Sequence, residues 1–552
     1  MTNTYTIGLD FGTLSGRAVV VRASDGEELG AAVHDYQHGV MDRTLNAGDN
    51  RPLPPDYALQ VPADYIEVLK QAVPQAVKES GVDPQRIIGI GVDFTSATVV
   101  VTDNEGTPLC EKPEFVNEPH AYVKLWKHHG ATEQAERIVS TARERGETWL
   151  SRYGGVLSSE LLLPKALELL EEAPAVYEKA AQIVDAVDWI TWKMTGVLSY
   201  AAGDSGYKRM YQDGNYPSQE FLEALNPSFG TVYSDKMSAP VRPLGASVGG
   251  LTAEAAEWMG LPEGVSVASG NIDAHVTAPA VQAVEAGQLT AIMGTSTCFI
   301  VSDPDLHEVP GLFGVVEGGV VPSLWGYEAG QTAVGDIFAW FVDNCVPEEY
   351  FTAATQAGVT VHEYLTSLAR QQEVGQHGLV ALDWFNGNRS ILADQKLSGL
   401  VLGQTLTTRP EDTYRALLES TAFGARVIIE NYLECGVGIN EIVVAGGLLK
   451  NDFLMQMYAD ITRLPLSTAV STQAPAVGAA IFAAQAAGLY PDLATASHAM
   501  GKKKEKAYVP DETRAQRYDA LYAQYVRLHD FFGKEAKNIM HELKDIQRNA
   551  LT

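Results

Sequence analysis

Cysteine is scarce in this sequence, and the cysteines it has are far apart. The four of them, Cys110, Cys298, Cys345 and Cys435, include no Cys-x-x-Cys pair. The sequence therefore offers no disulfide framework and no cysteine-based metal or redox site. We expect isolated, reduced thiols.

Long apolar runs are absent as well. No stretch approaches the roughly 18 apolar residues that a membrane-spanning helix needs. Residues 1–5 also lack the basic and then apolar layout of a signal peptide. We expect a cytoplasmic protein that has no membrane partner.

Positive charge is in short supply. The chain has 40 Lys and Arg against 69 Asp and Glu, which gives a formal net charge of −29. Nucleic acids are bound by clustered Lys and Arg, so this balance argues against a general nucleic-acid-binding protein. The one basic run, Lys502-Lys503-Lys504, is expected to be a solvated face.

Several familiar site motifs are missing. The chain has no Gly-x-x-x-x-Gly-Lys-Ser/Thr loop, no His-Glu-x-x-His, and no Gly-x-Gly-x-x-Gly that opens a βαβ unit. Gly245-Ala-Ser247-Val-Gly249 matches the Gly-x-Ser-x-Gly of serine hydrolases, but no buried strand precedes it. These absences argue against P-loop, zinc-protease, dinucleotide-binding and serine-hydrolase sites.

What the chain does have is length and alternating strands and helices. Its 552 residues, 46% of them apolar, exceed what one core usually covers, so two domains with small additions are expected. Periodicity predicts helices over 64–78, 161–172, 175–195, 411–432, 451–462 and 511–547, strands within 87–102 and over 441–445, and a polar loop over 204–211.

One local pattern occurs twice. Residues 5–21 read as two apolar strands around a turn of Gly12, Thr13, Ser15 and Gly16, and residues 289–301 repeat the arrangement around Gly294-Thr295. Such turns leave backbone N–H groups and small hydroxyls free for a phosphate. Two hairpins, one in each half of the chain, predict a polyphosphate held between two domains that can close on it.

With these hairpins, a strand that leads to Asp273, and Gly446-Gly447 after the 441–445 strand, the sequence resembles the FGGY family of carbohydrate kinases over residues 5–490. The resemblance rests on Asp10-Phe-Gly-Thr-Leu-Ser-Gly-Arg17, Gly91-Val-Asp-Phe-Thr-Ser96, Gly270-Asn-Ile-Asp-Ala-His275 and the stretch 445–460. The family's N-terminal signature survives only as Pro164-Lys165-Ala-Leu.

The resemblance implies an α/β fold of two actin-like (ribonuclease H-like) ATPase domains with the active site in the cleft between them. Residues 1–280 would hold the sugar and the catalytic base, residues 281–500 most of the nucleotide, and residues 501–552 would form a helical appendage. By analogy alone, a homodimer is expected.

The implied activity is transfer of a phosphoryl group from ATP, with Mg²⁺, to the terminal hydroxyl of a ketopentose. L-Ribulose is the first expectation, which would place the chain in L-arabinose catabolism. Xylulose, D-ribulose and ribitol are the alternatives within the family. An actin-like ATPase that uses ATP to change conformation is a further alternative outside it.

The resemblance also implies roles for individual residues. Asp273 would be the general base, although an Asp that merely caps a helix is the plainer alternative, and Asp10 would orient Mg²⁺. The residues expected to surround ATP are Thr13, Leu14, Ser15 and Arg17 in the first half, Gly294 and Thr295 in the second hairpin, and Gly446, Gly447 and Asn451 around the adenosine.

The expected sugar site has a small lining. Ser96-Ala97 stands where glycerol kinases carry an Arg-Glu pair, which leaves room for a longer substrate. Trp126 would lie against the carbon chain, Lys208 would donate to a sugar oxygen and Glu328 would accept from a hydroxyl. Two alternatives stay open: Trp126 could be a core residue, and Lys208 and Glu328 could form an exposed salt bridge.

Overall fold

The first half of the chain is built on a seven-stranded mixed sheet. The structure is a computed structural model that describes residues 4–551; the first three of residues 1–5, which lack a signal-peptide pattern, lie outside it, as does residue 552. The strand order is β11-β12-β5-β1-β2-β3, with β13 also paired to β5. The strands are β1 (Tyr5–Phe11), β2 (Ser15–Arg22), β3 (Glu28–Asp35), β5 (Ile87–Phe94), β11 (Ser247–Gly250), β12 (Ser266–Ala268) and β13 (Asn271–Ile272).

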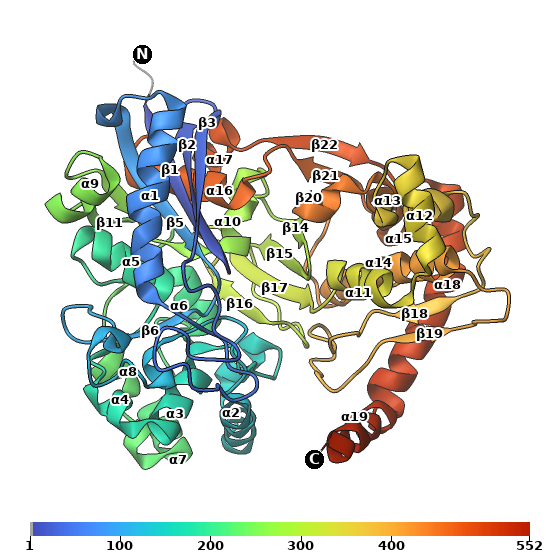
Figure 1. The fold of residues 1–552 in the computed structure, drawn as a ribbon, viewed down its shortest axis with the longest axis horizontal. Helices are drawn as coiled ribbons and strands as arrows, with labels where there is room; N and C mark the ends of the chain where they lie inside the picture. Colours follow the sequence, from blue (N-terminus) through green and yellow to red (C-terminus); the bar gives the residue numbers. More distant parts are fainter. Residues whose placement is uncertain (1–3, 552) are drawn as a thin grey trace.

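The second half carries another seven-stranded sheet, which lies beside the first (Figure 1). Its order is β16-β17-β15-β14-β20-β21-β22. The strands are β14 (Gln288–Met293), β15 (Thr297–Asp303), β16 (Gly314–Glu317), β17 (Trp325–Gln331), β20 (Glu441–Ala445), β21 (Leu466–Ala469) and β22 (Lys503–Tyr508). In both sheets an antiparallel hairpin, β1–β2 or β14–β15, continues into parallel strands, β5 and β12 or β20 and β21. The two predicted hairpins are therefore equivalent elements of two similar domains, and the predicted α/β fold is confirmed.

Smaller elements complete the first half. A four-stranded sheet runs in the order β4-β7-β6-β8, from β4 (Leu59–Gln60), β6 (Val99–Thr102), β7 (Val123–Lys124) and β8 (Gln182–Asp185). The helices are α1 (Pro62–Ser80), α2 (Thr132–Arg145), α3 (Leu162–Glu172), α4 (Pro174–Lys179), α5 (Ala186–Thr195), α6 (Ala202–Lys208), α7 (Gln219–Leu225), α8 (Val232–Lys236), α9 (Ala253–Met259) and α10 (Asp273–Ala280). Strands β9 (Tyr200–Ala201) and β10 (Val241–Arg242) pair with each other.

Two sequence predictions in this half are wrong. The single helix expected over 175–195 is α4, then β8, then α5, because Ile183 and Val184 form a buried strand that pairs with β6. The loop expected over 204–211 begins as α6, in which residues 203–208 are all buried. Helical hydrogen bonds pair some of the backbone groups of such a buried segment, whatever the polarity of its side chains.

The helices of the second half follow the prediction more closely. They are α11 (Gly335–Cys345), α12 (Glu348–Ala357), α13 (Val361–Arg370), α14 (Pro410–Glu434), α15 (Asp452–Thr462), α16 (Ala474–Ala486) and α17 (Leu493–Met500), with β18 (Val380–Leu382) and β19 (Leu400–Leu402) as a separate pair. The predicted C-terminal helical segment is α18 (Glu512–Asp530) and α19 (Asn538–Leu551), separated by a π-helical turn. Division of the chain at residues 280 and 500 stays a prediction.

Helix α16 lies against the first sheet although it comes late in the chain (Figure 1). It packs on β1, β5 and α10 through glycines. A Cβ on Gly8 would lie 1.7 Å from the carbonyl oxygen of Ala476, and one on Gly91 would lie 1.9 Å from that of Ala479. Only glycine permits a backbone to approach this closely. The apolar core around α16 contains residues from both halves, and so α16 joins them.

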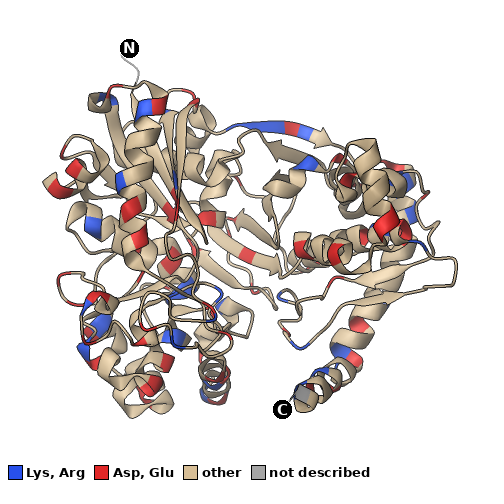
Figure 2. Ribbon diagram, viewed as in Figure 1, with Lys and Arg blue, Asp and Glu red and all other residues tan. Residues whose placement is uncertain are grey.

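The structure agrees with the composition. Within residues 4–551 no helix combines the length and apolarity needed to cross a bilayer, and all four cysteines are free thiols. Figure 2 shows the basic run along β22, where Lys502 and Lys504 are exposed and Lys503 pairs with Glu441. The prediction of a solvated basic face is confirmed for Lys502 and Lys504.

The contact between α16 and the first sheet generates a stability prediction. Gly91→Ala places a methyl group against the backbone of α16, where no side chain can rotate away, so we expect the free energy of unfolding to fall by about 3 kcal/mol. Urea denaturation measures the change. Gly438→Ala is the matched control because nothing lies within 4 Å of its added Cβ, and it should shift stability by no more than about 0.5 kcal/mol. Equal unfolding midpoints for the two variants would contradict the packing account.

Candidate active site

Two buried carboxyl groups stand side by side at the ends of parallel strands. Asp10 on β1 is the direct partner of Asp93 on β5, and the next residues, Phe11 and Phe94, stack with ring centroids 4.8 Å apart. Both aspartates sit in a Gly-x-Asp-Phe tetrapeptide, at residues 8–11 and 91–94. Asp93 was not among the predicted site residues. Repetition of this tetrapeptide was the pattern in the sequence that could have identified it.

Burial and mutual proximity shift the pKa values of Asp10 and Asp93. Burial, followed by the nearby Asp10 charge, raises the pKa of Asp93 well above its usual value. Burial also raises the pKa of Asp10, although Arg17 and a hydrogen bond from Asp93 oppose the shift. Among the described residues, neither oxygen of Asp93 has an ordinary hydrogen-bond partner. The two carboxyl groups therefore bring buried oxygen atoms together at one edge of the sheet, and burial favours the neutral form of Asp93.

Arg17 connects this carboxyl pair to the second half of the chain. Its Nε lies 3.2 Å from Oδ2 of Asp10, and its Nη1 donates to Oε1 of Gln473 at 2.6 Å, immediately before α16. Gln473 was not predicted, because nothing in its local sequence distinguishes it. The tip of the same hairpin is accessible: Leu14 is 61% exposed, and Thr13 and Ser15 are partly exposed.

Asp273 begins α10. Its Oδ1 accepts the N–H of Ala274 at 2.7 Å, so the carboxyl is held at the first turn of the helix. The N-cap position itself belongs to Ile272. Burial, then the negative charge of Asp10, raises the pKa of Asp273 to about 7, while Lys208 opposes the shift. A carboxyl with a pKa near neutrality can exchange a proton at physiological pH.

Lys208 and Glu328 form a buried ion pair. Nζ of Lys208, at the end of α6, lies 3.1 Å from Oε2 of Glu328, on β17. His275 on α10 brings its Nε2 to 3.3 Å from the same oxygen. Burial works to raise the pKa of Glu328, but Lys208 and His275 lower it to about 2. The salt bridge that the sequence left open is present, but it is buried and joins the two halves. His275 was not predicted as part of it.

The predicted sugar-site turn and tryptophan lie next to the first hairpin. Trp126 is partly exposed, and its indole Nε1 donates to the Thr13 hydroxyl at 3.1 Å. Ser96 is partly exposed, whereas Ala97 is buried and has a φ of 50°, in the left-handed region. Trp126 is thus neither a fully buried core residue nor isolated from the hairpin.

The predicted nucleotide residues of the second half gather at one edge of the second sheet. Gly294 and Thr295 form the β14–β15 turn, in which the Gly294 N–H donates to the Ser296 carbonyl at 2.8 Å. Gly446 and Gly447 follow β20, the parallel neighbour of β14, and both are exposed. Gly446 has a φ of 103°, and a Cβ there would lie 2.4 Å from the Met293 carbonyl oxygen, so the turn requires glycine.

Asn451 has a structural task at this edge. Its Oδ1 accepts the N–H of Leu454 at 3.1 Å and caps α15, and its Nδ2 lies 3.4 Å from the Thr366 hydroxyl. Any contact between Asn451 and a nucleotide would therefore have to be made by a side chain that is already fixed by the helix.

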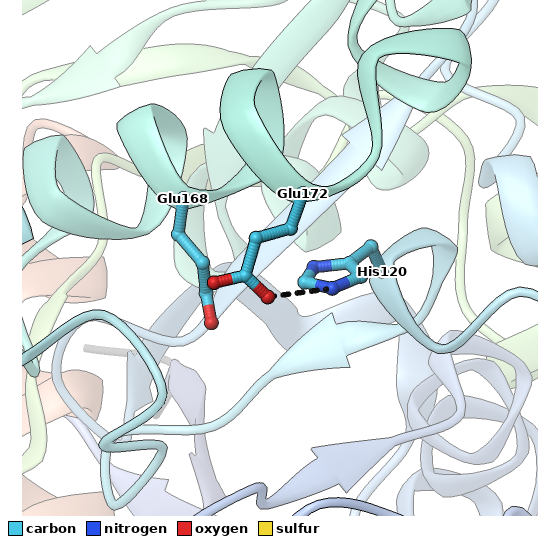
Figure 3. A group of neighbouring side chains, drawn as sticks. All are labelled: His120, Glu168 and Glu172. Carbon is cyan, nitrogen blue, oxygen red and sulfur yellow. Dashed lines mark ion pairs between the residues drawn. The ribbon is translucent and has the colours of Figure 1, made fainter.

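A third group of charged side chains lies apart from these residues. His120, Glu168 and Glu172 bring potential ligand atoms within 4.8 Å of one another (Figure 3). Glu168 already binds the ammonium of Lys124 and accepts from His128 Nε2 at 3.0 Å. Positive charge is supplied there by Lys124, so this group serves the core of the first half rather than a metal ion.

Comparisons with known proteins agree with this geometry. The description "FGGY family of carbohydrate kinases, N-terminal domain" matches residues 5–279, and the C-terminal domain of the same family matches residues 289–487. A protein of Mycolicibacterium smegmatis named Ribulokinase is 55% identical over 546 residues, which cover 99% of this chain and 97% of that protein. A protein of the same name from Bacillus licheniformis is 47% identical, over 97% of this chain and 98% of its own length.

Among solved structures, the gluconate kinase of Lactobacillus acidophilus superimposes with a TM-score of 0.81, over 98% of this chain and 100% of that one. At 17% identity this likeness shows the fold alone. It confirms the predicted pair of actin-like domains. The matches to both domains of one family, the near full-length relatives and the fold together establish that the chain belongs to the FGGY family of carbohydrate kinases.

Proposed function

We propose that the chain transfers the γ-phosphoryl group of ATP to the terminal hydroxyl of L-ribulose, giving L-ribulose 5-phosphate and ADP. Two relatives named Ribulokinase match this chain at 55% and 47% identity over nearly their whole length, which supports the choice of sugar. The cytoplasmic location and the homodimer stay predictions.

The observation that carries the chemistry is that the Asp273 carboxyl is buried and close enough to Asp10, Glu328 and Lys208 for their charges to shift its pKa. Phosphoryl transfer needs a positioned hydroxyl, a group to accept its proton and neutralisation of the phosphate charge. Asp273, with its raised pKa, takes the proton from the sugar hydroxyl as the oxygen attacks the γ-phosphorus. Lys208 donates to a sugar oxygen and Glu328 accepts from a sugar hydroxyl.

The residues present fit the Mg²⁺ that ATP-dependent transfer requires. Asp10 and Asp93 supply hard oxygen donors, and the oxygens of Asp93 have no ordinary partner among the described residues. Asp10 would hold the ion, directly or through water, and the neighbouring Asp93 would supply a second carboxyl group beside it. When bound, Mg²⁺ neutralises charge on the phosphate oxygens.

ATP is proposed to lie between the two hairpins. Thr13, Leu14 and Ser15 form the accessible tip of the first hairpin, and Arg17 adds a cation beside Asp10. Gly294 and Thr295 face the phosphates from the second sheet. Gly446 and Gly447 leave space for the nucleoside, because both are exposed and lack side chains.

The proposal is tested by ADP release from purified protein with Mg²⁺ and ATP. Reactions contain L-ribulose, D-ribulose, D-xylulose, ribitol, glycerol or no sugar. Strong stimulation by L-ribulose supports the proposal. Stimulation by another of these substrates alone would keep the mechanism and change the sugar, and equal turnover in every reaction would favour a conformational ATPase.

Replacement of the base should cost rate rather than binding. Asp273→Asn keeps the size of the side chain but cannot accept the proton as a carboxylate does, so kcat should fall about 10²- to 10⁴-fold, with little change in the KM for ATP. Steady-state kinetics measures both constants. Asp235→Asn, at an exposed position on α8, is the control and should match the parent protein. A kcat for Asp273→Asn within twofold of the parent would exclude Asp273 as the base.

The pKa of Asp273 predicts the pH profile. Only the carboxylate form can accept the proton, so log kcat should rise by about one unit per pH unit below pH 7 and level off above it. Because the negative charge of Glu328 contributes to the raised pKa of Asp273, Glu328→Gln should move the acidic limb to lower pH. A limb that stays in place in this variant, or a rate that falls as pH rises through 7, would contradict the assignment.

A further inference from the structure

Lys165 is a buried lysine that forms no ion pair with the described residues. It lies in α3, is 1% exposed, and its Nζ donates to the carbonyl oxygens of Ala97 at 2.7 Å and Leu125 at 2.8 Å. No carboxylate of the described part of the chain lies within 4.0 Å of this ammonium. The mechanism proposed above gives Lys165 no role.

Burial of a lysine ammonium costs folding free energy, which its hydrogen bonds have to offset. A buried ammonium loses its hydration, and an apolar side chain of similar volume would fill the same space without that penalty. Burial lowers the pKa of Lys165 to about 7. A neutral amine still has two N–H groups, one for each carbonyl, so the connection persists in either protonation state.

The first of these carbonyls is that of Ala97, in the turn formed by residues 95–98. Ala97 has a left-handed backbone with a φ of 50°, which is unfavourable for alanine. The turn is also fixed by the Thr98 hydroxyl, which donates to the Thr95 carbonyl at 2.8 Å. Lys165 therefore holds a strained segment beside Ser96.

The second carbonyl belongs to the residue before Trp126. The Trp126 indole donates to Thr13 at the tip of the first hairpin. Hydrogen bonds of Lys165 and of Trp126, joined by the backbone between Leu125 and Trp126, therefore link the 95–98 turn to the hairpin that is proposed to face the phosphates.

We propose that Lys165 is a positioning residue that sets the separation between the 95–98 turn and Trp126, and so the shape of the sugar site. This role rests on the proposed function for its kinetic consequence, although the separation itself is a property of the fold. Lys165 touches no reacting atom and acts through the two loops.

The kinetic test compares two lysine-to-methionine variants. Lys165→Met keeps the length and loses both donors, so a misplaced sugar loop should raise the KM for L-ribulose about 10- to 100-fold while the KM for ATP stays within about twofold. Lys236→Met is the matched control. Like Lys165, Lys236 donates to a backbone carbonyl, that of Ala180 at 2.6 Å, but it holds no loop of the proposed site. Lys165→Gln keeps N–H donors on a shorter side chain and should fall between the parent and Lys165→Met.

Hydrogen–deuterium exchange tests the same role without activity. In Lys165→Met and in Lys165→Gln, amides of residues 95–98 and 125–128 should exchange faster than in the parent, and Lys236→Met should leave these segments unchanged. Unchanged exchange there, or equal rises in the KM for both substrates, would overturn the positioning role. Absence of sugar-stimulated turnover in the parent protein would instead overturn the proposed function, and the exchange comparison would still decide the role of Lys165.

Discussion

The close approach of α16 to the first sheet is the constraint on which the rest of this structure depends. Gly8 and Gly91 occupy neighbouring register positions on β1 and β5, and each receives a carbonyl of α16 where any other side chain would collide. Two residues further along each strand stand Asp10 and Asp93. The tetrapeptide that allows the helix to pack therefore also delivers both carboxyls to the same edge of the sheet, and packing and site geometry are set by the same residues.

The site is assembled from both halves of the chain through buried charge. Lys208 and His275 come from the first half and Glu328 from the second sheet, whereas Arg17 of the first hairpin reaches Gln473 before α16. Buried ion pairs are weak sources of net stability because desolvation offsets their attraction. Their value here is geometric, since each pair specifies how one half of the site meets the other.

Much of the fold could be predicted because its signals are local. The two hairpins, α14 and α15 follow directly from periodicity and turn residues, and Asp273 and Glu328 were identified by resemblance to a family. The failures share a physical cause: β8 and α6 are defined by burial against distant strands, which no local pattern reports. Gln473 and His275 were missed for the same reason, since each acquires its partners only in the folded protein, whereas the repeated Gly-x-Asp-Phe tetrapeptide could have identified Asp93. Lys165 was noticed in the sequence only as part of a signature, because its two acceptors are backbone carbonyls that lie 68 and 40 residues away.

The glycine contacts of α16 also limit how this helix can move against β1, β5 and α10. Carbonyl oxygens of α16 occupy the space that a side chain would fill at Gly8 and Gly91. Sliding the helix along either strand would bring each oxygen into collision with the next residue. Helix α10 is held to α16 in the same manner, since a Cβ on Gly478 would lie 1.7 Å from the Val276 carbonyl oxygen. Sliding of α16 over the first sheet or over α10 is thereby opposed at three glycines, so these elements are expected to move as one unit.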